Sequence, residues 1–224
     1  MRKAISIRSA IPPEDTKERL ILAAKNLFAE KGFDGTTVKE IAERTNMNVS
    51  LISYHFNGKE GLYRTCIEQL GKAHLNTSER ILQNPTSLED FRVRLKLFIE
   101  EFIITHIDEP ELCRIVTREC DLQLEISRDI FQNTFLKAYE NLVIFFKHAQ
   151  AQGLLRKDLN IEIITRTFFG GLLHIAQKDK INETYFGETI RDKKYRESVV
   201  EQTLSFCLQG CVAIPHAPQK RGLK

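Results

Sequence analysis

The chain has 224 residues, of which 42% are hydrophobic and 28% charged, and its formal net charge is +3. These values are ordinary for a globular protein with one large or two modest domains, and so small a charge excess identifies no partner. No segment approaches about 18 uninterrupted apolar residues, and the N-terminus lacks the apolar run of a secretory signal. We therefore expect a cytoplasmic protein without a membrane span.

The five cysteines are expected to be reduced thiols that pack as small apolar side chains. They are Cys66, Cys113, Cys120, Cys207 and Cys211. The last two are four residues apart on a predicted helix, so a thiol redox switch is the alternative for this pair. No Cys-x-x-Cys pair is accompanied by a suitably spaced histidine pair, so we expect no metal site and no cofactor.

The first predicted helix runs from Glu14 to Lys31, and residues 1–15 are expected to form a largely flexible tail. Apolar residues between Leu20 and Phe28 recur at the spacing of one helix face. Gly32 follows and is expected to end the helix, because glycine adopts left-handed backbone geometry at little cost. This helix is predicted to support the segment that follows it.

A helix-turn-helix unit is predicted to begin at Thr37. Thr37 and Glu40 form a T-x-x-E capping box, which places the start of a short helix at about residue 37. Asn46 lies in the turn Thr45–Asn46–Met47, where asparagine tolerates the positive φ that a sharp turn between helices needs.

The second helix of the unit is predicted to run from Val49 to about Phe56, with Asn48 as its cap. Ile52 and Phe56 are four residues apart and are expected on its buried side. Asn57 and Glu60 form a further capping pattern, which predicts a third helix. Three helix starts at this spacing indicate helix-turn-helix geometry.

The remainder of the chain is predicted to be helical, so the fold class is all-α. The predicted helices cover residues 59–82, a segment capped by Ser87 with Asp90, 108–120, 125–152, 161–178 and 195–212. The charge-rich stretch 178–196 is predicted to be partly a flexible loop, and the tail 215–224 is predicted to be flexible.

About the first 65 residues resemble the DNA-binding domain of the tetracycline-repressor (TetR) family of transcription regulators. The matching residues are Ala24, Phe28, Gly32, Phe33, Thr36, Thr37, Ile41, Ala42, Ile52, Tyr54, His55, Phe56, Lys59, Glu60 and Leu62. Two departures are the turn Thr45–Asn46–Met47, where the family often has Ala-Gly-Val, and Ser53, where a tyrosine is common. The C-terminal two-thirds resemble the family only in helical pattern and in the Gly153–Arg156 segment.

The resemblance implies a DNA-binding domain over residues 16–76 and a helical ligand-binding and dimerisation domain over residues 77–214. It implies a homodimer that binds operator DNA and is released by a small-molecule effector, usually as a repressor. Dimers of the family usually pair through the last two long helices, here 161–178 and 195–212. Gly170 and Gly171 would suit close approach of a partner helix, and internal packing is the alternative for them.

The second helix of a helix-turn-helix enters the major groove, so its early residues are candidates for base contacts. The predicted DNA-binding residues are Thr36, Thr37, Asn48, Val49, Ser50, Ser53, Tyr54, His55 and Lys59. Val49, Ser50 and Ser53 are assigned to base edges, and the threonines, Tyr54, His55 and Lys59 to phosphates. The alternatives are capping roles for the threonines and a hydrophobic plug for residues 54–56.

The C-terminal part supplies aromatic residues and a few polar ones that suit a largely apolar small molecule. The predicted ligand-pocket residues are Phe98, Phe102, His106, Tyr139, Phe169 and His174. An ordinary aromatic core is the alternative for each of them.

A ligand-responsive transcription regulator is the leading prediction. A helical enzyme is the weakest alternative, because the sequence contains no Gly-rich phosphate loop, H-E-x-x-H or G-x-S-x-G motif, and we expect no enzymatic activity. A helical partner-binding protein whose helix-turn-helix does not bind DNA is the other alternative.

Overall fold

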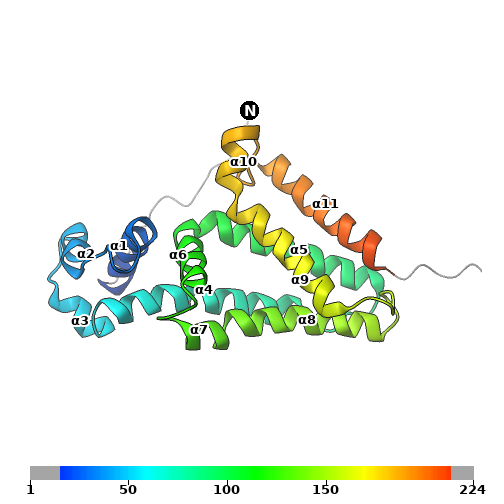
Figure 1. Cartoon of the computed structure of the whole chain (residues 1–224), viewed down its shortest axis with the longest axis horizontal. Coiled ribbons are helices and arrows are strands. Elements are labelled where there is room, and N and C mark those ends of the chain that lie inside the picture. The colour runs from blue at the N-terminus through cyan, green and yellow to red at the C-terminus, as the bar shows by residue number, and fades with distance from the viewer. Residues whose placement is uncertain (1–15, 213–224) are drawn as a thin grey trace, which may run out of the picture. The chain divides into compact units, whose positions relative to one another are not determined.

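The computed structural model describes residues 16–212, which are helical almost throughout (Figure 1). The helices are α1 (Thr16–Lys31), α2 (Val38–Thr45), α3 (Ser50–Phe56), α4 (Lys59–Ile81), α5 (Leu88–Asp108), α6 (Pro110–Asp121), α7 (Arg128–Asn133), α8 (Phe135–Ala151), α9 (Ile161–Gln177), α10 (Asp179–Phe186) and α11 (Lys193–Cys211). Over this range there is no strand, only an isolated antiparallel bridge between Leu155 and Val212. The predicted all-α class is confirmed, and the two predicted tails, 1–15 and 215–224, lie outside the described residues.

The chain divides into two compact units, each made of two separate segments. Unit 1 combines the chain up to Lys72 with Pro110–Gln132, and unit 2 combines Ala73–Glu109 with the chain from Asn133 onward. Helices α6 and α7 therefore cluster with the N-terminal helices, although they follow them by some 40 residues. The functional domain limits 16–76 and 77–214 remain a prediction.

Several helix ends follow the local signals in the sequence. Gly32 ends α1 with a φ of 77°, and Asn46 ends α2 with a φ of 54°. The side chain of Ser87 accepts a hydrogen bond from the backbone N–H of Asp90 at 3.1 Å and so caps α5. Asn57 differs from expectation, because it ends α3 in left-handed geometry with a φ of 58° and does not cap the next helix.

One further expectation was wrong, and the stretch predicted to be partly a loop contains a short helix. The single helix predicted over residues 125–152 is interrupted at buried Thr134, whose φ of −128° and ψ of −74° separate α7 from α8. The charge-rich stretch 178–196 contains α10, which is held by its own polar residues. The carboxylate of Asp179 accepts hydrogen bonds from the Thr189 hydroxyl and the Ile190 N–H, both at 2.8 Å, and Gly187 ends the helix.

The core of unit 2 is formed by apolar side chains from α5, α8, α9 and α11. At its centre Phe91 stacks on Phe145 with ring centroids 4.9 Å apart, and Phe146 meets Phe91 edge-on at 5.4 Å. All three rings are fully buried. None of the helices within residues 16–212 is both long and apolar enough to span a bilayer.

Unit 1 is held by a buried carboxylate on α6. Glu119 is only 2% exposed, and it accepts hydrogen bonds from the Tyr63 hydroxyl on α4 at 3.0 Å and from the Ile126 N–H at 2.9 Å. The adjacent Arg118 donates to the Phe28 carbonyl near the end of α1 at 3.1 Å. Burial beside Glu119 raises the pKa of Tyr63, so its hydroxyl remains a donor.

We predict that Tyr63→Phe lowers the free energy of unfolding by about 1–3 kcal/mol, because it leaves one oxygen of a buried carboxylate without a donor. Glu68→Gln is the control, since the Lys72–Glu68 ion pair at 2.8 Å is solvent-exposed and such pairs contribute less than about 1 kcal/mol. Urea denaturation followed by circular dichroism measures both. An equal loss of the free energy of unfolding in the two variants would contradict the stabilising role of the Tyr63–Glu119 hydrogen bond.

Candidate functional site

The α2–turn–α3 segment has the geometry of a helix-turn-helix. The Asn46 N–H donates to the Glu43 carbonyl at 3.1 Å, and the Met47 N–H donates to the Ala42 carbonyl at 2.9 Å, which closes the end of α2. The Asn48 side-chain oxygen accepts from the Ser50 N–H at 2.9 Å, so Asn48 satisfies a donor at the start of α3 as predicted. The turn is thus held by backbone groups and one short side chain.

Helix α3 has a buried face and an open face. Ile52 is fully buried and Phe56 is 8% exposed, so these residues anchor the helix. The open face carries Tyr54, which is 81% exposed, and Val49, which is 39% exposed. Ser50 and Ser53 are also exposed. Val49, Ser50 and Ser53 are the residues expected to meet base edges, and Tyr54 is expected to meet phosphates.

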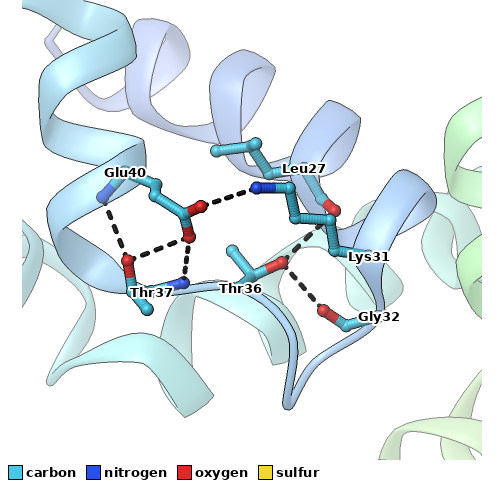
Figure 2. A network of polar contacts seen from close by, with 6 residues as sticks. All are labelled: Leu27, Lys31, Gly32, Thr36, Thr37 and Glu40. Carbon is cyan, nitrogen blue, oxygen red and sulfur yellow. Dashed lines mark hydrogen bonds and ion pairs between the residues drawn. The ribbon is translucent and has the colours of Figure 1, made fainter.

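The two threonines before α2 have different surroundings (Figure 2). Thr36 is fully buried, and its hydroxyl donates to the carbonyls of Gly32 at 2.8 Å and Leu27 at 3.2 Å. That hydroxyl fastens the loop to the end of α1, so Thr36 is a structural residue and its predicted phosphate contact is not retained. Thr37 is exposed at the start of α2, where its hydroxyl and backbone take part in the capping box.

Glu40 closes the capping box and also pairs with α1. Its carboxylate accepts from the Thr37 N–H at 2.9 Å and lies 2.6 Å from the ammonium of Lys31 (Figure 2). The hydrogen bond from Lys31, followed by those from Thr37, lowers the pKa of Glu40 to about 2. The carboxylate is therefore charged but compensated, which limits its repulsion of a phosphate near Thr37.

Lys59 lies at the start of α4, and its ammonium position is defined. The ammonium donates to the Phe33 carbonyl at 3.0 Å and lies 4.1 Å from the centre of the Phe33 ring. His55 is half-buried, with its ring 4.8 Å from that of Tyr54 and 6.1 Å from that of Phe56. The hydrophobic-plug interpretation therefore applies to Phe56, whereas Tyr54 points to solvent.

Unit 2 brings five of the six predicted pocket residues together in one aromatic cluster. The Phe102 ring lies 4.4 Å from His106, 5.5 Å from Phe169 and 6.3 Å from Phe98, all between ring centroids. Tyr139 joins the cluster at 5.6 Å from Phe169. The sixth residue, His174, is exposed on α9 and makes none of these ring contacts, so its assignment to the pocket stays a prediction without support from the cluster.

His74 on α4 and Phe135 on α8 complete this aromatic cluster. The ring of His74 lies 5.6 Å from Phe102, 5.9 Å from Phe135 and 6.1 Å from His106. His74 was not among the predicted pocket residues, because the part of α4 around it is mostly polar in sequence. The one signal of an inward position was its four-residue spacing from Leu70 and Ser78, which are both buried.

Both imidazoles of the cluster are neutral at pH 7. Burial, with a smaller contribution from His106, lowers the pKa of His74 to about 4. Burial also lowers the pKa of His106, although the hydrogen bond of its Nδ1 with the Phe102 carbonyl at 2.9 Å acts in the opposite direction. The cluster therefore offers hydrogen-bonding groups without a net charge.

Residues 20–66 match the family model described as bacterial regulatory proteins, tetR family. A curated relative, "Probable HTH-type transcriptional regulator YttP" of Bacillus subtilis, is 32% identical over 122 residues, which cover 54% of this chain and 58% of the relative. The biofilm operon icaADBC HTH-type negative transcriptional regulator IcaR of Staphylococcus epidermidis is 40% identical over 52 residues, which cover 23% of this chain and 28% of IcaR. The matches thus span 58% and 28% of these relatives' own lengths.

Two solved structures share the fold over most of the chain. The ketosteroid transcriptional regulator KstR2 of Mycobacterium tuberculosis has a TM-score of 0.70 at 16% identity, with 92% of this chain and 100% of KstR2 covered. The fatty acid degradation regulator FadR of Bacillus halodurans has a TM-score of 0.66 at 16% identity, with 86% and 98% covered. At such identities the likeness shows the common arrangement of helices.

We predict that His74→Phe flattens the pH dependence of stability. The unfolded chain protonates His74 below about pH 6.5, whereas the folded chain does so only near pH 4, so wild-type stability falls as the pH decreases from 7. At pH 5 this difference lowers the free energy of unfolding of the wild type by about 2 kcal/mol, a loss that the variant should not show. Urea unfolding at pH 7 and pH 5 measures the change, and an unaltered difference between the two pH values would refute it.

Proposed function

The chain belongs to the TetR family of bacterial regulatory proteins, and from this premise we propose that it is a cytoplasmic, non-enzymatic transcription regulator that binds operator DNA. The observation that carries the proposal is the open face of α3, which presents Val49, Ser50, Ser53 and Tyr54 while Ile52 and Phe56 are buried. An exposed second helix of this kind is what a helix-turn-helix inserts into the major groove.

The contacts divide into two groups. Val49, Ser50 and Ser53, with Asn48 beside them, face base edges, where valine can meet a thymine methyl group and serine can donate or accept. None of the three offers the bidentate pattern of arginine, asparagine or glutamine, so direct readout is expected to be modest. Thr37, Tyr54, His55 and Lys59 are assigned to phosphates, together with the unpaired N–H groups at the start of α4.

We further propose that the protein is a repressor that leaves its operator when a small, largely apolar ligand binds in unit 2. The aromatic cluster around Phe102 supports this proposal, because it combines apolar rings with the two imidazoles of His74 and His106. A ligand can act in this way only if it binds the released conformation more tightly than the DNA-bound one.

A homodimer through α9 and α11 is also proposed. Gly170 and Gly171 are exposed on α9, and a Cβ atom added to either would meet nothing within 4 Å. Packing inside this chain therefore does not require glycine there, which favours close approach of a second chain. Ile163 on α9 and Phe206 on α11 add exposed apolar surface of 59% and 80%.

We predict that Lys59→Ala weakens binding to all DNA sequences alike and reduces the slope of log K against log salt by about one, because one phosphate contact is lost. Lys72→Ala is the control, since Lys72 is an exposed lysine farther along α4 that pairs with Glu68 at 2.8 Å. Fluorescence anisotropy with DNA from beside the protein's own gene, titrated with salt, measures both variants.

Unchanged affinity of Lys59→Ala would remove Lys59 from the interface. The same titration separates the proposal from the alternative of a partner-binding protein: if the wild type shows no binding that depends on salt or on DNA sequence, the helix-turn-helix does not serve DNA recognition.

We predict that replacing both Gly170 and Gly171 by alanine weakens the homodimer by about tenfold or more, because two methyl groups enter a close helix contact. Without such a contact the substitutions should only stabilise α9, since alanine is the better helix former by about 1 kcal/mol per residue. Sedimentation velocity over a concentration series gives the dissociation constant, and circular dichroism checks the fold. An unchanged constant with a raised Tm would exclude these glycines from the interface.

A further inference from the structure

The aromatic cluster of unit 2 is a less buried edge of the core, since Phe102 belongs to the same core as Phe91, Phe145 and Phe146. Phe91, Phe145 and Phe146 are fully buried. In contrast, His74 and His106 keep part of their side-chain surface accessible, although both are surrounded by rings. Phe135, Tyr139 and Phe169 are likewise half-buried. The cluster therefore presents ring surfaces that the described residues do not fully cover.

The two imidazoles offer complementary hydrogen-bonding groups. The Nδ1 of His106 lies 2.9 Å from the Phe102 carbonyl, so Nδ1 carries the proton and Nε2 is left as an acceptor. Within the described residues the His74 ring makes only aromatic contacts, so its single N–H is available as a donor. One donor and one acceptor thus lie on rings whose centres are 6.1 Å apart.

A buried hydroxyl on α9 also lacks a hydrogen-bond partner among the described residues. The Thr165 hydroxyl on α9 is fully buried and, within residues 16–212, makes no hydrogen bond. Thr165 precedes Phe169 by four residues, so both lie on the same face of α9. A buried hydroxyl without a partner is costly, and a bound polar group or water is the usual explanation.

We propose that this cluster binds an apolar molecule with a terminal carboxylic acid or primary carboxamide. In this assignment the carbonyl oxygen of the head group accepts from His74, its O–H or N–H donates to Nε2 of His106, and the apolar body lies against Phe102, Phe135 and Phe169. As the effector of the regulator this ligand rests on the function proposed above, whereas its binding is a property of unit 2 alone.

Other head groups fit less well. A cationic ligand would lack a counterion at the imidazoles, because no carboxylate is among the groups that shift the pKa of His74 or His106. A metal ion lacks ligands, because no group of three or more His, Cys, Asp or Glu residues is placed to hold one in the described part of the chain. An ester carries an acceptor but no donor, and it would leave Nε2 of His106 buried without a partner.

The test compares head groups on the same apolar body by calorimetric titration of the full chain without DNA. The probes are decanamide, decanoic acid and methyl decanoate, and 2-naphthamide, 2-naphthoic acid and methyl 2-naphthoate. In at least one series the amide should bind about tenfold or more tightly than the ester, the ratio expected for one unsatisfied buried acceptor. Esters that bind as tightly as amides in both series, or no binding by either amide, would overturn the proposal.

Variants then assign the two contacts to the imidazoles. His106→Phe should reduce the amide-to-ester ratio to about one, because it preserves the ring and removes the acceptor that only the amide satisfies. His74→Phe removes the donor that both probes use, so it should weaken amide and ester alike and leave their ratio unchanged. The control is His148→Phe, a half-buried histidine of the same unit that hydrogen-bonds Asn84 and should retain the full ratio. If the control loses the preference as His106→Phe does, or if His74→Phe weakens neither probe, the assignment to this pair fails.

Two further arms separate the ligand classes and the two proposals. Between pH 8 and pH 7 the acid should gain about tenfold in affinity if it binds in its neutral form, while the amide should not change. Addition of the tighter amide to the protein–DNA complex tests its action as an effector. Binding without any effect on DNA, or in a protein that binds no DNA, leaves the site valid and refutes the regulatory role.

Discussion

The fold of unit 1 depends on one buried carboxylate. Glu119 on α6 accepts hydrogen bonds from Tyr63 on α4 and from the Ile126 N–H, and the neighbouring Arg118 donates to the end of α1. A carboxylate at 2% exposure is tolerated only because its oxygens have donors. The bonds to Tyr63 and Phe28 connect residues 56 or more positions apart, so they form only when the downstream α6 has packed on the N-terminal helices. The compact unit that contains the helix-turn-helix therefore includes α6, which sequence order would assign to the C-terminal domain.

This arrangement gives the proposed DNA contacts a rigid support. The loop before α2 is fastened by the buried hydroxyl of Thr36, and the start of α4 by the contact of Lys59 with Phe33. Helix α3 has only seven residues, too few to be stable alone, and its orientation comes from Ile52 and Phe56. The same burial that holds α3 leaves its other face to solvent. The amphipathic pattern of α3 therefore both fixes the orientation of the helix and exposes the face that is proposed to meet DNA.

Local signals in the sequence predicted local features well. The capping box at Thr37 and the left-handed Asn46 were both found as expected, because each depends on residues within a few positions of one another. Features set by distant contacts were missed. The break at Thr134 has no glycine or proline to mark it, and the inward position of His74 is decided by rings from α5 and α8. Thr36 has the composition of a phosphate-binding residue, yet carbonyls nine and four residues upstream already occupy its hydroxyl.

The order of the chain connects the aromatic cluster of unit 2 with unit 1. The chain passes between the units at residues 72/73, 109/110 and 132/133, and His74, His106 and Phe135 lie within four residues of these three points, respectively. Helix α4 is continuous across the first point, so the helix that carries His74 also carries Tyr63 and begins at Lys59. A ligand bound at these three rings, as proposed, would therefore lie close along the chain to each point at which the chain passes between the units. Its effect on DNA binding is bounded by the difference between its affinities for the released and the DNA-bound conformations, however tightly it binds.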